Sequence, residues 1–516
     1  MPPRTIVTPV QRDSARAAHV LRGSVSLVSG VAVALAFPPI DFWPAMPLGI
    51  AGLLVVVRDV SGRAGTALGL LFGLGFMLPL LRWITIIGPD AWVALSVLEA
   101  LFFGLLGWTW SRVRALSWWP AAVALTWVLA ESLRGVIPFG GLPWGTLAFG
   151  LVDTPVVRYG RLGGTALVSF VVVLAVAVVV WAVETRHRHT WSMAAGAGVV
   201  LLLGLAFVLP AGAAGPSDTV QVAAVQGDVP GAGMDPFAEQ RAVLHNHAEA
   251  THELAAEVAA GTRPSPDIVI WPENSTDIDP YTDQSAYDEI DGAVRAIGVP
   301  TLVGAVVDGP DEDHVQNMGI VWSPETGPGA RYIKRHPVPF GEYIPFRDVL
   351  SGMIERLDQI PRDFYRGDTA GVLDLGSVRI GDVICFEVVY DGLIRDVIDG
   401  GAELLVVQTN NATYTGTGQL AQQFATSRYR AIETGRTVVV AATNGISGIV
   451  APDGTVVQES GIRTRDLLSA EVQLASGRTL GVRIGHEVEV ALALGGAVAV
   501  SVAVWERRRR VGRMDT

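Results

Sequence analysis

The chain has 516 residues, enough for two or three domains, but only 17% of them are charged and the mean hydropathy is +0.39. This composition is too apolar for an ordinary soluble enzyme, and the single cysteine excludes an intramolecular disulfide and a metal site built from several cysteines. The net charge of −12 hides an asymmetry: residues 211–487 carry 19 basic and 39 acidic residues, whereas the remainder carries 19 basic and 11 acidic. We therefore expect an acidic soluble block within a basic, apolar frame, and no nucleic-acid binding, because the basic residues are scattered.

Eight apolar stretches are candidates for membrane spans, since a spanning helix needs about 20 apolar residues. Residues 1–22 form a basic tail that precedes them. A signal peptide is the alternative interpretation of the first apolar run, but it lacks a convincing cleavage site and further apolar runs follow. The predicted spans are residues 23–38, 44–58, 64–81, 91–111, 118–133, 162–183, 192–210 and 487–505, of which the second and fifth are short.

The arginines between these spans predict their orientation, because loops on the cytoplasmic side carry an excess of basic residues. If the N-terminus is cytoplasmic, the cytoplasmic segments hold Arg58, Arg63, Arg112, Arg114, Arg186, Arg188, Arg507 to Arg510 and Arg513. The outer loops 38–44 and 82–90 hold one arginine between them, and 135–160 is a longer outer loop rich in Gly and Pro. This pattern predicts both termini inside and residues 211–487 outside.

Residues 211–217 are a linker by composition, and after them short β-type runs alternate with helical stretches. We predict strands at 220–226, 268–271, 301–307, 378–384, 404–407, 438–442, 449–451 and 455–458, a hairpin of 320–323 with 331–333, and helices at 236–260, 286–297, 388–398 and 419–434. Such alternation indicates an α/β domain with helix-covered sheets. The predicted parts are residues 1–213 for the tail and seven spans, 218–480 for the α/β domain, and 486–516 for the last span and tail.

Cys385 follows the predicted buried strand 378–384 and precedes a predicted helix, so we expect it at a strand-to-helix turn. At such a turn a thiol points out of the sheet edge, and the positive end of the helix dipole favours a thiolate. The alternative is that this lone cysteine is a small buried hydrophobic residue.

Lys334 is the one lysine among 38 basic residues. Lysine offers a compact charge whose pKa can shift, which arginine does not, so a lone lysine indicates a site where a guanidinium does not serve. Chance retention of a single lysine is the alternative interpretation.

Glu273, Lys334 and Cys385 each follow a predicted strand, and catalytic groups in α/β sheets gather at the carboxyl ends of strands. A thiol needs a base and a positive group for its oxyanion, roles that Glu273 and Lys334 can fill. Taken singly, they could equally be a loop glutamate, a surface lysine and a core cysteine. His245, His247 and His252 share one predicted helix without a third ligand on one face, so we expect a solvated helix face, no metal and no cofactor.

Three motifs resemble those of the nitrilase (carbon–nitrogen hydrolase) superfamily, in order. They are Trp-Pro-Glu-Asn-Ser at 271–275, Tyr-Ile-Lys-Arg-His-Pro-Val-Pro-Phe-Gly-Glu-Tyr-Ile-Pro at 332–345 and Asp-Val-Ile-Cys-Phe-Glu at 382–387. Residues 409–412, 428–436 and 443–447 are similar to the C-terminal part of the same domain. Eight spans with this domain between the seventh and eighth resemble the bacterial apolipoprotein N-acyltransferase family, over nearly the whole chain.

The resemblance implies an αββα sandwich with a Glu-Lys-Cys triad of Glu273, Lys334 and Cys385, supported by Glu342 and Glu387. It implies transfer of an acyl chain from a phospholipid to Cys385, and from this thioester to the α-amino group of a diacylglyceryl-cysteine at a lipoprotein's N-terminus. It also implies a multi-pass protein of the bacterial cytoplasmic (inner) membrane with an extracytoplasmic catalytic domain. We expect a monomer.

Some residues depart from the family pattern. Phe386 stands where a tyrosine usually follows the nucleophile, no tryptophan follows Pro230, and Tyr414 lies near a position where tryptophan is common. These departures bear on acyl-chain and headgroup preference. Two other functions stay open at this point: a membrane-tethered amidase or nitrilase with a soluble substrate, and a scaffold without activity. Seven spans are excessive for a tether, and the intact triad disfavours a scaffold.

Overall fold

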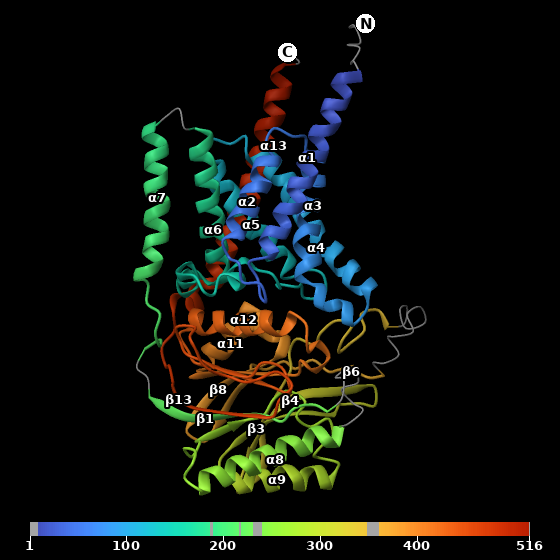
Figure 1. The fold of residues 1–516 in the computed structure, drawn as a ribbon, viewed down its shortest axis with the longest axis vertical. Coiled ribbons are helices and arrows are strands. Elements are labelled where there is room, and N and C mark those ends of the chain that lie inside the picture. Colours follow the sequence, from blue (N-terminus) through green and yellow to red (C-terminus); the bar gives the residue numbers. More distant parts are fainter. Residues whose placement is uncertain (1–8, 186–188, 216–217, 231–239, 348–360, 515–516) are drawn as a thin grey trace. The chain divides into compact units, whose positions relative to one another are not determined.

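The structure is a computed structural model that describes residues 9–185, 189–215, 218–230, 240–347 and 361–514 (Figure 1). Contacts divide the chain into two compact units. The first consists of Met1–Leu151, Thr165–Val208 and Glu487–Thr516, and the second of Val152–Gly164 and Leu209–His486. We describe each unit by itself.

The first unit is built from apolar helices. Within the described residues they are α1 (Pro9–Ala34), α2 (Ala45–Val56), α3 (Gly62–Leu80), α4 (Pro89–Val113), α5 (Trp119–Arg134), α6 (Gly160–Glu184), α7 (His189–Val208) and α13 (Leu480–Met514), with the short turns η1 (Arg82–Ile86), η2 (Leu147–Gly150) and η3 (Pro155–Tyr159). A helix is found at each predicted span. Five stretches of the described chain are long and apolar enough to cross a membrane: Arg16–Ala34, Gly62–Leu80, Pro89–Val113, Pro155–Glu184 and Leu480–Arg510. Ala45–Val56 and Met193–Val208 are shorter apolar helices.

Small residues let the helices of this unit approach closely. A Cβ added to Gly69 of α3 would stand 2.1 Å from the carbonyl oxygen of Phe103 on α4. Such close packing of backbones is the usual way in which membrane helices associate. One charged pair is buried among them, because Arg134 Nε donates to Glu99 Oε2 at 2.8 Å and both side chains are 1% exposed. The unit therefore has the features of a membrane-embedded helix bundle.

The second unit contains two β-sheets. The first has the strand order β13-β1-β2-β3-β4-β5 with β6 paired to β4, and the second has the order β12-β11-β10-β9-β8-β7. The strands are β1 (Thr219–Gln226), β2 (Ile268–Ile270), β3 (Thr301–Asp308), β4 (His314–Ser323), β5 (Gly327–Ile333), β6 (Asp363–Phe364), β7 (Val372–Leu375), β8 (Val378–Ile384), β9 (Leu404–Thr409), β10 (Val438–Ala442), β11 (Gly448–Val450), β12 (Val456–Glu459) and β13 (Asp466–Gln473). Parallel pairing of β1, β2 and β3, and of β8, β9 and β10, brings several strand ends to common edges.

Helices cover both outer faces of this pair of sheets. The helices are α8 (Gln240–Ala259), α9 (Gln284–Ile297), α11 (Asp391–Asp399) and α12 (Gln419–Thr434), with the short turns η5 (Cys385–Val389) and η6 (Ala412–Tyr414). In Figure 1, α8 and α9 lie on one side of the sheets, and α11 and α12 on the other. One apolar core joins the two sheets, with Val222 and Ile270 from one and Ile380 and Val406 from the other. A second core joins α8 and α9 to the first sheet. The unit is therefore an αββα sandwich, as predicted.

Most predicted elements are confirmed to within a few residues, but one helix is wrong. The predicted helix 388–398 is instead the 3₁₀ turn η5 followed by α11, because Tyr390 between them has an extended backbone (φ −91°, ψ 111°). The short strands β6 and β7 and the longer β13 had no sequence signal. Residues 236–239 of the predicted helix 236–260 lie outside the described residues, and the rest of it matches α8.

Candidate active site

Glu273 follows β2 and lies buried at the carboxyl edge of the first sheet, with an exposed fraction of 3%. Its Oε1 accepts hydrogen bonds from Lys334 Nζ at 2.9 Å and from Asn317 Nδ2 at 2.7 Å. Its Oε2 accepts from the backbone N–H of Asn410 at 2.7 Å, just beyond β9. Charged hydrogen bonds from three directions hold the carboxylate in one orientation. The strand-end prediction for Glu273 therefore agrees with its position.

Lys334 follows β5 and is 2% exposed. Its ammonium group lies between two carboxylates, 2.9 Å from Glu273 Oε1 and 2.8 Å from Glu342 Oε1. Burial would lower the pKa of Lys334, but the charges of Glu273 and Glu342 raise it well above its usual value. The lone lysine is therefore a fixed point charge in a dry site rather than a surface residue.

Cys385 begins η5 directly after β8, and its backbone is left-handed, with φ at 57°. Its Sγ lies 3.2 Å from Thr409 Oγ1 at the end of β9. Burial raises the pKa of the Cys385 thiol to about 12, the charge of Glu273 raises it further, and Lys334 lowers it. The expectation that the helix end would favour a thiolate is therefore wrong for the resting protein. The physical reason is that desolvation outweighs both Lys334 and the dipole of a five-residue turn.

Glu387 lies fully buried two residues after the cysteine, and its carboxylate gathers donors from two segments. Oε1 accepts from the backbone N–H groups of Arg335 at 2.7 Å and His336 at 2.9 Å, and Oε2 accepts from that of Ile384 at 2.8 Å. The Tyr332 hydroxyl donates to the same carboxylate at 2.9 Å. Glu387 therefore ties the cysteine turn to the segment that carries Lys334.

Glu342 comes from the loop after Lys334 and completes the polar cluster. Its Oε1 contacts Lys334 Nζ and accepts from Asn317 Nδ2 at 3.2 Å, while its Oε2 accepts from the backbone N–H of Val338 at 2.7 Å. The structure thus brings Glu273, Lys334 and Glu342 into direct contact, and their charges all act on the thiol of Cys385.

Sequence reasoning missed Asn317 and Thr409. Asn317 lies in β4, is 1% exposed, and its single amide nitrogen donates to both Glu273 and Glu342. The one available signal was an amide within an otherwise apolar strand. Thr409 ends β9 next to the thiol, and a threonine in a strand gives no signal of its own.

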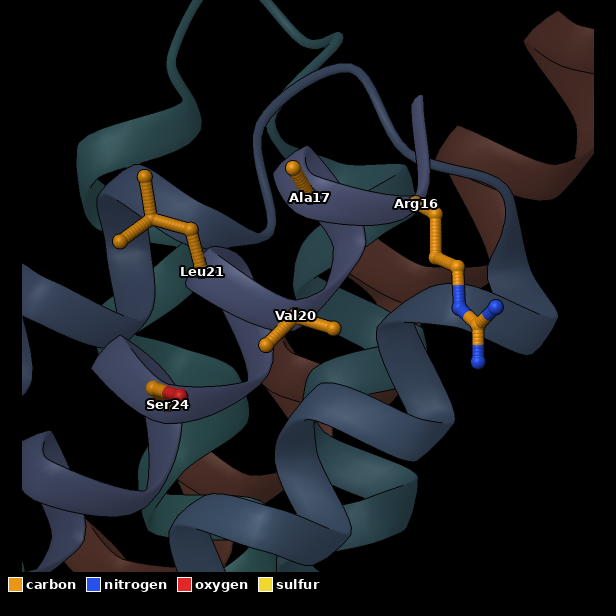
Figure 2. Close-up of a pocket in the computed structure, with 5 residues that line it drawn as sticks. All are labelled: Arg16, Ala17, Val20, Leu21 and Ser24. Atoms are coloured by element: carbon orange, nitrogen blue, oxygen red, sulfur yellow. The ribbon is translucent and has the colours of Figure 1, made fainter. Parts of the chain in front are cut away.

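Figure 2 shows a separate hollow lined by Arg16, Ala17, Val20, Leu21 and Ser24 of α1. It belongs to one helix of the first unit and contains neither a nucleophile nor a carboxylate. We therefore place the candidate active site at the cluster around Cys385.

Comparisons with known proteins match both units. The family described as apolipoprotein N-acyltransferase N-terminal domain matches residues 29–179, and carbon-nitrogen hydrolase matches residues 221–481. The apolipoprotein N-acyltransferase of Mycolicibacterium smegmatis is 38% identical over 95% of this chain and 86% of its own. That of Pseudomonas putida is 30% identical over 84% of this chain and 87% of its own.

Among solved structures, an amidase from Nesterenkonia sp. is 17% identical, with a TM-score of 0.36, covering 52% of this chain and 95% of its own. The sequence matches extend over both the apolar helices and the αββα domain. The chain therefore belongs to the apolipoprotein N-acyltransferase family.

Proposed function

We propose that this membrane acyltransferase carries out the last step of bacterial lipoprotein maturation through a thioester on Cys385. The acyl chain comes from a phospholipid and ends on the α-amino group of the diacylglyceryl-cysteine at the N-terminus of an apolipoprotein. The observation that carries the proposal is the buried cluster in which Lys334 Nζ lies 2.9 Å from Glu273 and 2.8 Å from Glu342, next to the one cysteine of the chain.

The first half-reaction needs a base, because a thiol with a pKa of about 12 is almost fully protonated at neutral pH. Glu273 takes the proton from Cys385, and the sulfur attacks the ester carbonyl of the phospholipid. Lys334 stabilises the resulting oxyanion. When the oxyanion collapses, the carbon–oxygen bond of the ester breaks, and the leaving lysophospholipid alkoxide takes the proton from Glu273.

The second half-reaction uses the same groups in reverse order. The lipoprotein's terminal amine attacks the thioester, Glu273 accepts a proton from the nitrogen, and the carbon–sulfur bond breaks. Cys385 then regains its proton from Glu273. Glu342, which shares Lys334 and Asn317 with Glu273, orients the incoming amine. This is a ping-pong order, because lysophospholipid leaves before the acceptor reacts.

The membrane arrangement supports a lipid substrate. We propose eight spans with both termini cytoplasmic and the catalytic domain on the outer face of the cytoplasmic membrane, on the basis of the arginines between the helices. The proposed parts are residues 1–213, 218–480 and 486–516, acting as a monomer. Seven spans before the domain exceed what a membrane tether needs.

The test is acyl transfer by the purified full chain in phospholipid vesicles. With a synthetic diacylglyceryl-cysteine peptide, the peptide should gain one acyl chain, and matched vesicles with Cys385→Ala should give none. Small aliphatic amides and nitriles serve as the competing substrates. Hydrolysis of these compounds without peptide acylation would contradict the proposal and would indicate an amidase or nitrilase instead.

A further inference from the structure

Thr409 lies at the centre of a buried hydrogen-bond network at the end of β9. Its Oγ1 is 3.2 Å from Cys385 Sγ, 2.5 Å from Asn411 Oδ1 and 2.9 Å from Gln423 Nε2. Thr409, Asn411 and Gln423 are each at most 3% exposed. The network therefore joins α12 to the sulfur of the proposed nucleophile.

The amides of this network fix the direction of each hydrogen bond. Asn411 Nδ2 donates to Gln419 Oε1 at 2.9 Å, and Gln419 Nε2 donates to Gln423 Oε1 at 2.6 Å. Asn411 Oδ1 is thereby left as an acceptor, and Gln423 Nε2 as a donor to Thr409. A hydroxyl group has one proton and two lone pairs. In the resting protein, the Thr409 proton therefore goes to Asn411, and its second lone pair faces the thiol.

Removal of the thiol proton changes what the sulfur needs. A thiol can donate to a hydroxyl oxygen, whereas a thiolate can only accept. We propose that Thr409 is a catalytic residue whose hydroxyl rotates from Asn411 Oδ1 to Cys385 Sγ and donates its hydrogen bond to the thiolate. The proton balance is simple: the thiol proton passes to Glu273, and the Thr409 proton stays on its own oxygen. Hydrogen bonds to charged groups are the stronger ones, so the thiolate gains more than the amide loses.

The chain offers a direct test, because Cys385 is its one cysteine and any alkylation of a thiol reports on this residue alone. The full-length protein is treated with a small haloacetamide between pH 7 and 10, where the rate follows the thiolate fraction. Thr409→Val, which keeps the shape and removes the hydroxyl, should react about tenfold more slowly across this range. Thr409→Ser should react within about threefold of the wild type, because the hydroxyl is restored.

Thr426→Val is the matched control, since Thr426 is 2% exposed on α12 and donates to the Gln422 carbonyl oxygen rather than to the sulfur. It should react as fast as the wild type. Equal rates for Thr409→Val and the wild type, or a Thr409→Ser rate as low as that of valine, would overturn the proposal. The inference rests on Cys385 as nucleophile, but alkylation needs no phospholipid, so its failure is distinguishable from failure of acyl transfer.

A second, independent feature lies between the two sheets, where acceptor oxygens meet without a donor. Both carboxylate oxygens of Asp382 on β8 and Oε1 of Gln408 on β9 are buried and have no hydrogen-bond partner among the described residues. A Cβ added to Gly319 on β4 would stand 2.2 Å from Asp382 Oδ2 and 2.7 Å from Gln408 Oε1, so the two oxygens are near neighbours. Only a glycine leaves room for this pair.

Gln408 has one further contact, which leads to the base. Its Nε2 donates to the carbonyl oxygen of Trp271 at 2.6 Å, two residues before Glu273. We also infer that Asp382 is a neutral carboxylic acid that donates its proton to Gln408 Oε1, and that this pair positions the segment carrying Glu273. Burial raises the pKa of Asp382 well above its usual value, and the charges of Glu387 and Glu273 raise it further. Two adjacent acceptors without a donor would otherwise each bear the penalty of an unmade hydrogen bond.

Asp382→Asn and Asp382→Leu test this positioning role, with turnover at saturating phospholipid and peptide as the readout. Asparagine can donate to Gln408 as the acid does, so this variant should keep turnover within about threefold of the wild type. Leucine cannot, and should lower kcat about tenfold with little change in KM. Loss of activity in Asp382→Asn would overturn the inference, as would equal kcat values for the two variants. If the leucine variant does not fold, the asparagine result alone decides.

Discussion

At the scale of single residues, the site is governed by how one cation is shared. Lys334 contacts Glu273 and Glu342 at hydrogen-bond distance and acts on the thiol of Cys385 through its charge. Two carboxylates around one buried ammonium leave the cluster with a net negative charge, and burial raises the thiol pKa further. The resting thiol is therefore protonated, and its reactivity depends on transfer of that proton to Glu273.

The first prediction concerns Lys334→Arg, which keeps the charge. A planar guanidinium is too large to stand between Glu273 and Glu342 and still reach the oxyanion, so turnover should fall by about 100-fold or more. The measurement is acyl transfer per folded molecule. Arg335→Lys is the matched control, because Arg335 makes a more exposed ion pair with Asp396 and should retain activity. Near-normal turnover by a folded Lys334→Arg protein would remove Lys334 from the chemistry.

A second residue, His247, predicts a pH dependence of stability. His247 is fully buried on α8, with its Nδ1 2.7 Å from the Val243 carbonyl oxygen, and burial lowers its pKa to about 4. Above about pH 6.5 it is neutral in both the folded and unfolded states. As the pH falls from 6.5 to 4, only the unfolded state binds the proton, so the folded state loses up to about 3 kcal/mol.

The variant His247→Phe, which keeps a ring beside Trp271, isolates this effect. The difference in thermal midpoint between wild type and variant should be constant from pH 8 to about 6.5. Below that, the wild type should lose stability relative to the variant. A difference that stays constant down to pH 4.5 would show that His247 does not titrate as described.

At the scale of elements, the site is where four strand ends meet: β2 leads to Glu273, β5 to Lys334, β8 to Cys385 and β9 to Thr409. The first three were predictable, because buried parallel strands read as β-branched runs whose ends are easily seen in a sequence. The turn after Cys385 was not predictable in the same way. The apolar spacing in 388–398 is helical, yet Glu387 draws the chain into a 3₁₀ turn by accepting from Ile384. Burial, which determines the thiol pKa, depends on tertiary packing and has no local signal.

Glu387→Gln tests how the turn is held to the Lys334 segment. An amide has one acceptor oxygen where the carboxylate has two, and its nitrogen would face N–H donors. The variant should be less stable by about 1–3 kcal/mol, with slower acyl transfer per folded molecule. Thermal unfolding and turnover measure the two effects. Glu403→Gln, at a partly exposed carboxylate that accepts from the Arg379 backbone, is the control and should resemble the wild type. An unchanged stability for Glu387→Gln would contradict the role of this carboxylate.

At the scale of the whole molecule, the sequence predicted an α/β block between apolar helices, and the two units follow that division closely. Apolar runs of span length and the composition of the linker make such boundaries visible in a sequence. The number of spans is harder to predict, because α2 and Met193–Val208 are shorter than a usual membrane helix. Charge between the helices is independent of helix length and supports the eight-span proposal.

Reporter insertions test the proposed orientation. A reporter placed after Ser217 should be active only outside the cytoplasm, and one placed after Arg510 only inside. The reason is the excess of arginine in the segments assigned to the cytoplasm. A cytoplasmic signal from the Ser217 insertion would overturn the orientation and, with it, access of the catalytic domain to exported lipoproteins.

The central claim is that Cys385 carries the acyl chain, and mass spectrometry of the protein after incubation with phospholipid alone tests it most directly. A poorly hydrated site protects the thioester from hydrolysis, so the acyl-enzyme should accumulate when no acceptor is present. The wild type should gain the mass of one fatty-acyl chain on Cys385, removable by neutral hydroxylamine, while Cys385→Ala gains none and Glu273→Gln gains it far more slowly. If lysophospholipid is released only when both substrates are present, with no adduct on Cys385, the covalent mechanism is wrong and direct transfer must replace it.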